Sequence, residues 1–126
     1  MSLMLLVLAA ATAQPPAIPP QVQIIAESGK YVLRTLDGAK PLYTFDKDAP
    51  GKSNCVDRCL AAWPALVAPA GAKATGKWTI VKRADGSGQW AFAGKPVYTF
   101  VRDHDSTASG DGMAGVWHLL PTFPTR

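Results

Sequence analysis

The sequence has few of the residues and motifs that usually mark an enzyme. It contains two cysteines and two histidines among 126 residues. It has no Gly-x-Ser-x-Gly sequence around an activated serine, no glycine-rich phosphate-binding loop and no dinucleotide-binding fingerprint. Hydrolase and nucleotide-dependent chemistry therefore have no supporting motif, and the sequence favours a protein that is not an enzyme.

Long hydrophobic runs are also scarce. The apolar run over residues 3–11 is about half of the roughly 20 residues that a transmembrane helix needs, so no such helix is expected. The run leads into Ala11-Thr12-Ala13, the small-x-small pattern of a signal-peptide cleavage site. We therefore expect residues 1–13 to be a signal peptide, and the mature chain to be exported and soluble, in the periplasm or outside the cell.

Concentrated charge of one sign is missing as well. The net charge is +4, but the basic residues are scattered between Lys30 and Arg126. Proteins that bind nucleic acids usually gather such charge on one patch or stripe, so no nucleic-acid partner is expected. A scattered basic surface is compatible with a loose attraction to an anionic envelope surface. Envelope proteins are the other class of partner that we consider.

The sequence does contain an internal repeat. Residues 41–48 (Pro-Leu-Tyr-Thr-Phe-Asp-Lys-Asp) return as residues 96–103 (Pro-Val-Tyr-Thr-Phe-Val-Arg-Asp). Each copy follows a Gly-Lys-aromatic start and an Asp-Gly turn signal, and each is followed by a tryptophan, Trp63 or Trp117. Two copies are too few for a propeller or a solenoid, so two units that share one core are expected.

These spacings predict the domain organisation. A proline-rich linker over 14–21 is expected to be an extended tether, because proline removes backbone donors and fixes φ. A single domain over 22–126 follows. It contains repeat one over about 29–63 and repeat two over about 76–119.

The patterns within the repeats predict mostly strands. Residues 31–36 are rich in β-branched and aromatic residues, and the Asp-Gly turn after them predicts a hairpin with a second strand over 42–46. In repeat two, 78–83 is the equivalent strand, and 89–92 is an additional strand. The predicted fold class is mainly β, with two repeated antiparallel β-meander units sharing one core and a short helix after the first unit.

The repeated motif supplies the candidate site residues, which are Tyr43, Phe45, Asp48, Tyr98, Phe100 and Asp103. A period of two places Tyr43 and Phe45 on one face of their strand. We interpret the aromatic side chains, together with the four tryptophans, as core, and an exposed groove for a planar or sugar-like ligand as the alternative. Each motif aspartate ends a strand, where we expect it to accept backbone N–H bonds from the following turn.

The two cysteines lie in the stretch predicted to be helical, residues 53–63, with Ser53 or Asn54 as its N-cap. Helical geometry brings the Cα atoms of Cys55 and Cys59 to about 6 Å, which is within disulfide range. Export favours the oxidised form. A structural disulfide that staples this helix is therefore expected, and no cofactor.

Copper is the alternative for the same residues. Thiolates select Cu(I), and an imidazole from His104 or His118 is a suitable third ligand beside Cys55 and Cys59. This hypothesis describes a periplasmic metal or redox accessory protein. It requires stoichiometric Cu(I) binding that is lost in Cys55→Ser.

The spacing Tyr43-x4-Asp48, repeated at Tyr98-x4-Asp103, resembles a family of bacterial secreted-repeat lipoproteins defined by a Tyr-x4-Asp motif. The resemblance covers about residues 29 to 119 and includes the Cys-x3-Cys segment. It implies an exported, repeat-built β domain, and the family has no assigned biochemical activity. This chain has no cysteine near the expected cleavage site, so the lipid anchor of the lipoprotein members is not expected here.

Overall fold

The computed structural model describes residues 13–104 and 107–126, so the predicted signal peptide, apart from Ala13, lies outside the described residues. The elements follow in the order β1 Val22–Glu27, β2 Lys30–Thr35, β3 Tyr43–Phe45, α1 Arg58–Ala62, β4 Val67–Ala68, β5 Trp78–Lys82, β6 Gly88–Phe92, β7 Lys95–Tyr98, the 3-10 turn η1 Met113–Gly115, β8 Trp117–Leu119 and β9 Phe123–Pro124. The mainly β fold class is confirmed. In this part of the chain no helix is long and apolar enough to cross a membrane.

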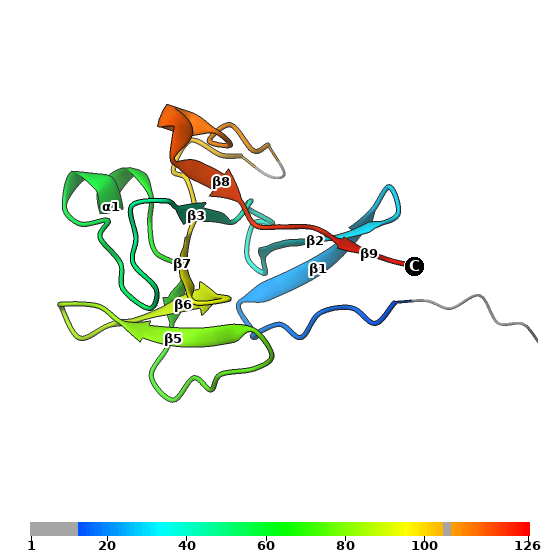
Figure 1. The fold of residues 1–126 in the computed structure, drawn as a ribbon, viewed down its shortest axis with the longest axis horizontal. Coiled ribbons are helices and arrows are strands. Elements are labelled where there is room, and N and C mark those ends of the chain that lie inside the picture. Colours follow the sequence, from blue (N-terminus) through cyan, green and yellow to red (C-terminus); the bar gives the residue numbers. More distant parts are fainter. Residues whose placement is uncertain (1–12, 105–106) are drawn as a thin grey trace, which may run out of the picture.

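The strands form two antiparallel sheets (Figure 1). One has the order β1-β2-β9, and the other has the order β4-β6-β7-β3-β8 with β5 paired to β6. The two motif strands β3 and β7 are neighbours in the larger sheet, and Tyr43 lies opposite Tyr98. On its other side β3 pairs with β8, where Phe45 lies opposite Trp117. The larger sheet therefore interleaves strands from both repeats.

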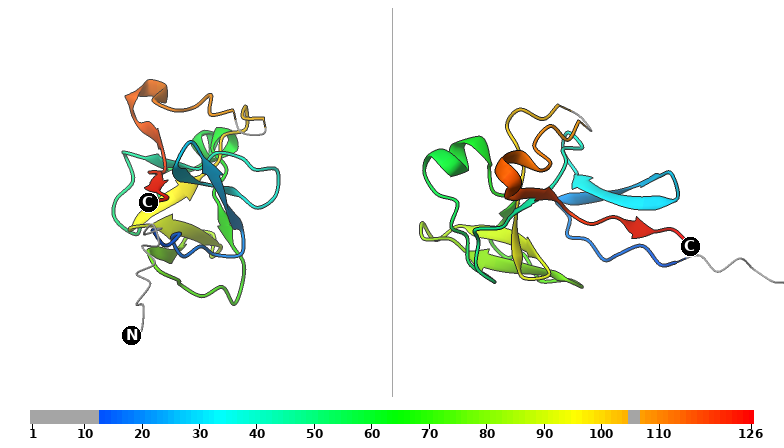
Figure 2. Two further views of the ribbon diagram at one scale, coloured as in Figure 1. Left: turned by 90° about the vertical axis from the view of Figure 1, so that its right-hand side faces the viewer. Right: turned by 45° about the horizontal axis from the view of Figure 1, so that its top comes forward.

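The predicted hairpin between 31–36 and 42–46 is wrong. Strand β2 pairs with β1 and β9. Its pairing with the segment just before β3 is limited to one isolated bridge, between Arg34 and Pro41. The β1–β2 hairpin closes through Ser28 and Gly29, which both have positive φ. A two-residue turn of this kind suits strand twist and costs less loop entropy than a longer connection. Figure 2 shows this hairpin beside β9.

Both faces of the central strands are buried. Leu42 and Val97 belong to one hydrophobic cluster, which includes Trp78 and Trp90. The tyrosines of the same strands belong to a second, aromatic cluster on the opposite face, with Trp63, Phe100 and Trp117. Both repeats contribute to each cluster, so the predicted sharing of a core is confirmed. The alternation of side chains separates two buried clusters here, rather than core from solvent.

Helix α1 is shorter than the helix predicted over 53–63. It begins at Arg58, and Asp57 before it has a positive φ of 55° and makes no capping hydrogen bond. The predicted caps bond to the two repeat motifs instead: the Ser53 hydroxyl bonds to the Tyr98 hydroxyl, and the Asn54 side-chain amide donates to the Lys47 carbonyl. The prediction fails because these polar side chains have partners elsewhere in the fold that compete with capping.

The proline-rich segment over 14–21, which is predicted to be an extended tether, packs partly against the core. Pro19 is fully buried, and Ile18 packs against the cluster that contains Trp90. The Trp90 indole also donates to Gln21 Oε1 at 2.9 Å. Proline has no N–H group that would need a partner in the interior, so its burial sacrifices no hydrogen bond of that kind.

Candidate functional site

Each motif tyrosine is bonded to the aspartate of the other repeat. The Tyr43 hydroxyl donates to Asp103 Oδ2 at 2.5 Å, and the Tyr98 hydroxyl donates to Asp48 Oδ2 at 2.7 Å. Both tyrosines are fully buried, Asp103 is 2% exposed, and Asp48 is half-buried. We call these two pairs the crossed pairs. They join the repeats side chain to side chain.

The second oxygen of each aspartate holds the loop that follows it. Asp48 Oδ1 accepts from the Asn54 backbone N–H at 2.7 Å. Asp103 Oδ1 accepts from the Ser109 backbone N–H at 2.8 Å and from its hydroxyl at 2.6 Å. In both repeats the backbone donor lies six residues after the aspartate. The predicted role of the aspartates as acceptors of backbone N–H bonds is confirmed.

The aromatic side chains beside the crossed pairs form a continuous stack. Trp63 and Trp117 are parallel within 4°, with centroids 3.8 Å apart, in the middle of the stack. Phe45 stacks on Trp117 at 4.3 Å, and Phe100 stacks on Trp63 at 4.1 Å. Each phenylalanine therefore contacts the tryptophan of the other repeat. Because both tryptophans and Phe100 are buried, the structure supports core packing and not an exposed aromatic groove.

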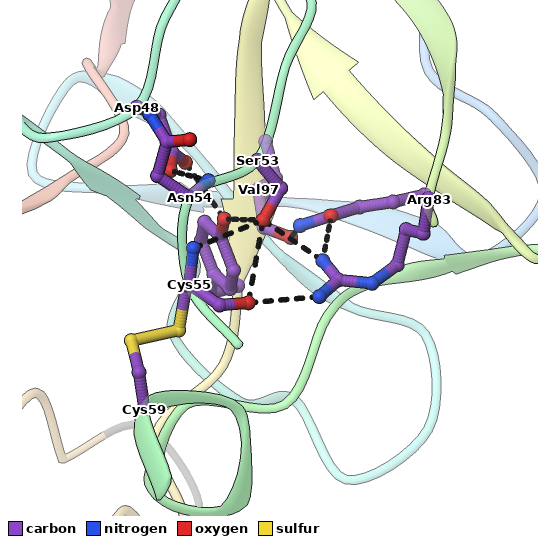
Figure 3. Close-up of a disulfide and its surroundings, with 9 residues drawn as sticks. Asp48, Ser53, Asn54, Cys55, Cys59, Arg83 and Val97 are labelled. Atoms are coloured by element: carbon purple, nitrogen blue, oxygen red, sulfur yellow. Dashed lines mark hydrogen bonds between the residues drawn. A yellow bond between two sulfur atoms is a disulfide. The ribbon is translucent and has the colours of Figure 1, made fainter. Parts of the chain in front are cut away.

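A polar network surrounds the Tyr98–Asp48 pair (Figure 3). Since the Tyr98 proton goes to Asp48, the Ser53 hydroxyl donates to the Tyr98 oxygen at 2.6 Å. Arg83 donates to Ser53 Oγ at 2.9 Å and to the Cys55 carbonyl at 2.8 Å. It also donates to the buried Gln89 at 2.6 Å. Arg83 from repeat two therefore holds the loop that carries the first cysteine of repeat one.

Several residues of this network were missed by sequence reasoning. The pair Asn54 and Ser109 could have been found, because both lie at the same distance after a motif aspartate. Gly110 gave no such signal: a Cβ there would lie 2.5 Å from Trp63 Cη2, so only glycine fits against the stack. Arg83 and Gln89 gave no signal either, because nothing in their spacing relates them to Ser53.

The crossed pairs keep both motif phenols neutral. Burial, followed by the hydrogen bond to Asp103, raises the pKa of Tyr43 far above its ordinary value. Burial also raises the pKa of Tyr98 to about 12; the bond to Asp48 adds to this shift and the bond to Ser53 opposes it. Neither phenol is therefore available as a base or nucleophile near neutral pH.

The shifted phenol pKa values predict a loss of stability at high pH. The folded state binds both phenolic protons more tightly than the unfolded chain, so this stabilisation is present below about pH 10 and is lost as pH rises through 12. In a Tyr31→Phe variant, which retains only Tyr43 and Tyr98, the absorbance of tyrosinate at alkaline pH should appear later for the folded protein than for the protein in urea. Coincident titration curves would contradict this expectation.

Comparison with known proteins bears on these repeats. A family model described as a secreted repeat of unknown function matches residues 25–67 and again residues 79–120. The chain belongs to this family. The two matches each contain one Tyr-x4-Asp motif, and the crossed pairs join one secreted repeat to the other. No curated protein and no solved structure matches the chain.

The disulfide is specific to the first of the two secreted repeats. Cys55 and Cys59 are bonded, with an S–S distance of 2.02 Å and Cα atoms 5.2 Å apart. Cys55 is fully buried and precedes α1, so the bond ties the loop that follows Asp48 to the first turn of the helix. It therefore fixes the loop that carries Ser53 and Asn54. The predicted disulfide is therefore present, but only Cys59 of the two residues lies in the helix that it was expected to staple.

The copper hypothesis for this secreted-repeat protein stays a prediction. Both thiols are joined in the disulfide, and His118 Nε2 lies 2.7 Å from Asp46 Oδ2 at the surface. Within residues 13–104 and 107–126, no group of three or more His, Cys, Asp or Glu side chains lies close enough to hold a metal ion. Cu(I) binding by Cys55 and Cys59 would first require reduction of their bond.

Proposed function

We propose that this exported protein is a non-enzymatic binding module of the cell envelope. The observation that carries the proposal is the placement of the motif groups. The phenols and carboxylates that the two repeats share are bonded to each other and to backbone groups in the interior or at its edge. Motif residues bonded in this way stabilise the fold, so we expect exposed residues outside the motif to bind the partner.

A groove beside the disulfide is the surface that suits this role best. It has a volume of about 670 Å³ and lies between the loop before α1 and the turn that joins β5 to β6. Exposed Lys52 and Lys82 line it, together with Val56, which is 52% exposed. Lining acidic residues are Asp57 and Asp85, and the Asp85 carboxylate already accepts two hydrogen bonds from Ser87.

The groove combines cationic and apolar groups, which suits an anionic envelope surface. A basic residue close to an anionic membrane contributes about 1 kcal/mol to binding. An exposed aliphatic side chain such as Val56 adds apolar contact when it enters the headgroup region. Arg83 forms part of the groove wall and is fixed by its bonds to Ser53 and Gln89, so that wall is held in place.

Binding to vesicles tests this proposal. The protein should sediment with phosphatidylglycerol vesicles and not with phosphatidylcholine vesicles, and added salt should release it. Lys52→Glu with Lys82→Glu should weaken binding about 30-fold or more, because two attractive charges near the surface are lost. The control is Lys30→Glu with Lys73→Glu, which changes the net charge equally at two exposed lysines outside the groove.

The two double variants separate a site from a general charge effect. If both weaken binding equally, the groove is not the contact surface. If the unmodified protein does not sediment with phosphatidylglycerol vesicles, the proposal that it binds an anionic envelope surface is wrong.

A further inference from the structure

Strand β1 has one paired edge and one open edge. It is first in the sheet order β1-β2-β9, so only β2 pairs with it. Because the turn has two residues, Glu27 and Lys30 form a hydrogen-bonded pair. Hydrogen-bonded and non-hydrogen-bonded pairs alternate along an antiparallel ladder, so Ile25 and Val32 also form a hydrogen-bonded pair. The same alternation makes Gln21 and Leu36 a hydrogen-bonded pair, and Leu36 N indeed donates to Gln21 O at 2.8 Å.

The backbone groups of Ile24 and Ala26 consequently point away from β2. Within residues 13–104 and 107–126, these outward groups form no hydrogen bond to another segment. The segment before β1 does not pair with this edge, since Ala13 donates to Thr125 O at 3.1 Å beyond β9. An open edge of this kind is a template for pairing with another strand.

The other edge strands of the described sheets are all shorter than β1, which has six residues. The outer side of β8 is covered, because Gly112 donates to Trp117 O at 2.8 Å. Strand β9 is only two residues long and ends in Pro124. Strand β5 carries Lys82 at its end. Strand β1 contains no proline and no lysine, and its one charged residue is Glu27 at its end.

We propose that β1 is an interface for a second copy of this chain, through antiparallel β1–β1 pairing about a two-fold axis. Ile24 of each copy pairs with Ala26 of the other through two backbone hydrogen bonds, and Ile25 lies opposite Ile25 on the axis. This is an isologous contact, in which the same patch serves both copies. It goes beyond the proposed binding function and does not depend on it.

Side chains in this register are complementary. Val32 is the partner of Ile25 within one copy, and both are half-buried. Across the four strands that meet at the axis, the neighbouring side chains are therefore Val32 and Ile25 of one copy, then Ile25 and Val32 of the other, and all four are apolar. The next row runs from Arg34 and Gln23 of one copy to Glu27 and Lys30 of the other, so like charges are not adjacent.

Sedimentation velocity over a wide range of protein concentration tests this interface. The area of a single strand pair falls below the roughly 1,200 Å² of stable interfaces, so the dimer should dissociate on dilution. Ile25→Lys should keep the protein monomeric at all concentrations, because two cations would meet on the axis. The matched control is Ile80→Lys at the exposed edge of β5, which should dimerise like the unmodified protein.

Two further variants guard against misfolding of a lysine variant. Ala26→Pro removes an outward N–H that β2 does not use, so circular dichroism should be unchanged while dimerisation is lost. Ile25→Cys should form an oxidised dimer, because residues opposed in a non-hydrogen-bonded pair lie within disulfide reach, and Ile80→Cys should not. A protein that stays monomeric at every concentration overturns the proposal. A dimer that is lost in Ile80→Lys and kept in Ile25→Lys also overturns it.

Discussion

Replacing Trp63 by alanine should lower the free energy of unfolding by about 3–5 kcal/mol. Trp63 is 5% exposed and lies in the stack between Trp117 and Phe100, with Tyr43 edge-on at 5.2 Å. Truncation removes the ring contacts and leaves a cavity. The walls of this cavity belong to both repeats, so they cannot collapse without moving the central sheet. Urea unfolding followed by circular dichroism measures the loss.

Matched variants define the specificity of this effect. Leu36→Ala, at a residue that is 60% exposed, should change stability by no more than about 0.5 kcal/mol. Because Trp63 and Trp117 are in contact, the double alanine variant should lose less than the sum of the single losses. A loss below about 1 kcal/mol for Trp63→Ala would show that the stack does not hold the repeats together.

Asp103→Ala should cost more stability than Asp48→Ala, although the two aspartates occupy equivalent motif positions. Removing the Asp103 carboxylate leaves the buried Tyr43 hydroxyl without its acceptor, at a cost of about 1–3 kcal/mol, and also removes the acceptor of the Ser109 N–H. Asp48 is half-buried, so water can replace part of what its carboxylate provides. Thermal and urea unfolding of both variants measures the difference. Equal losses would contradict it.

The raised pKa of Asp48 predicts how an asparagine variant should compare with the alanine variant. Burial raises the pKa of Asp48, and the bonds from Asn54 and Tyr98 oppose the rise. The folded state then binds this proton more tightly than the unfolded chain, so the stabilisation linked to the bound proton is fully present below pH 3.8 and is lost as pH rises through the raised pKa, while the ionised carboxylate still accepts its hydrogen bonds. Asp48→Asn, which is neutral and keeps an acceptor oxygen, should therefore be tolerated better at neutral pH than Asp48→Ala.

Local patterns in the sequence were sufficient for some of the strands and for the identity of the repeat. The β-branched and aromatic runs marked β2 and β5, and the Pro-x-Tyr-Thr-Phe sequences marked β3 and β7. Strand propensity and turn chemistry are properties of neighbouring residues, so they can be read without the fold. The same reasoning failed for the partner of β2, because a turn signal does not specify which of several strands pairs with the one before it.

The sequence by itself determined that this protein is built from two secreted repeats, that each contributes a tyrosine, a phenylalanine and an aspartate, and that most of its aromatic residues are core. Only the tertiary structure decided that these groups are exchanged between the repeats. Tyr43 and its acceptor Asp103 are 60 residues apart, and Tyr98 and Asp48 are 50 apart. Such partners depend on the antiparallel pairing of β3 with β7, which places Tyr43 opposite Tyr98. A motif repeated in sequence shows which residues are equivalent; the pairing of the strands determines which of them meet.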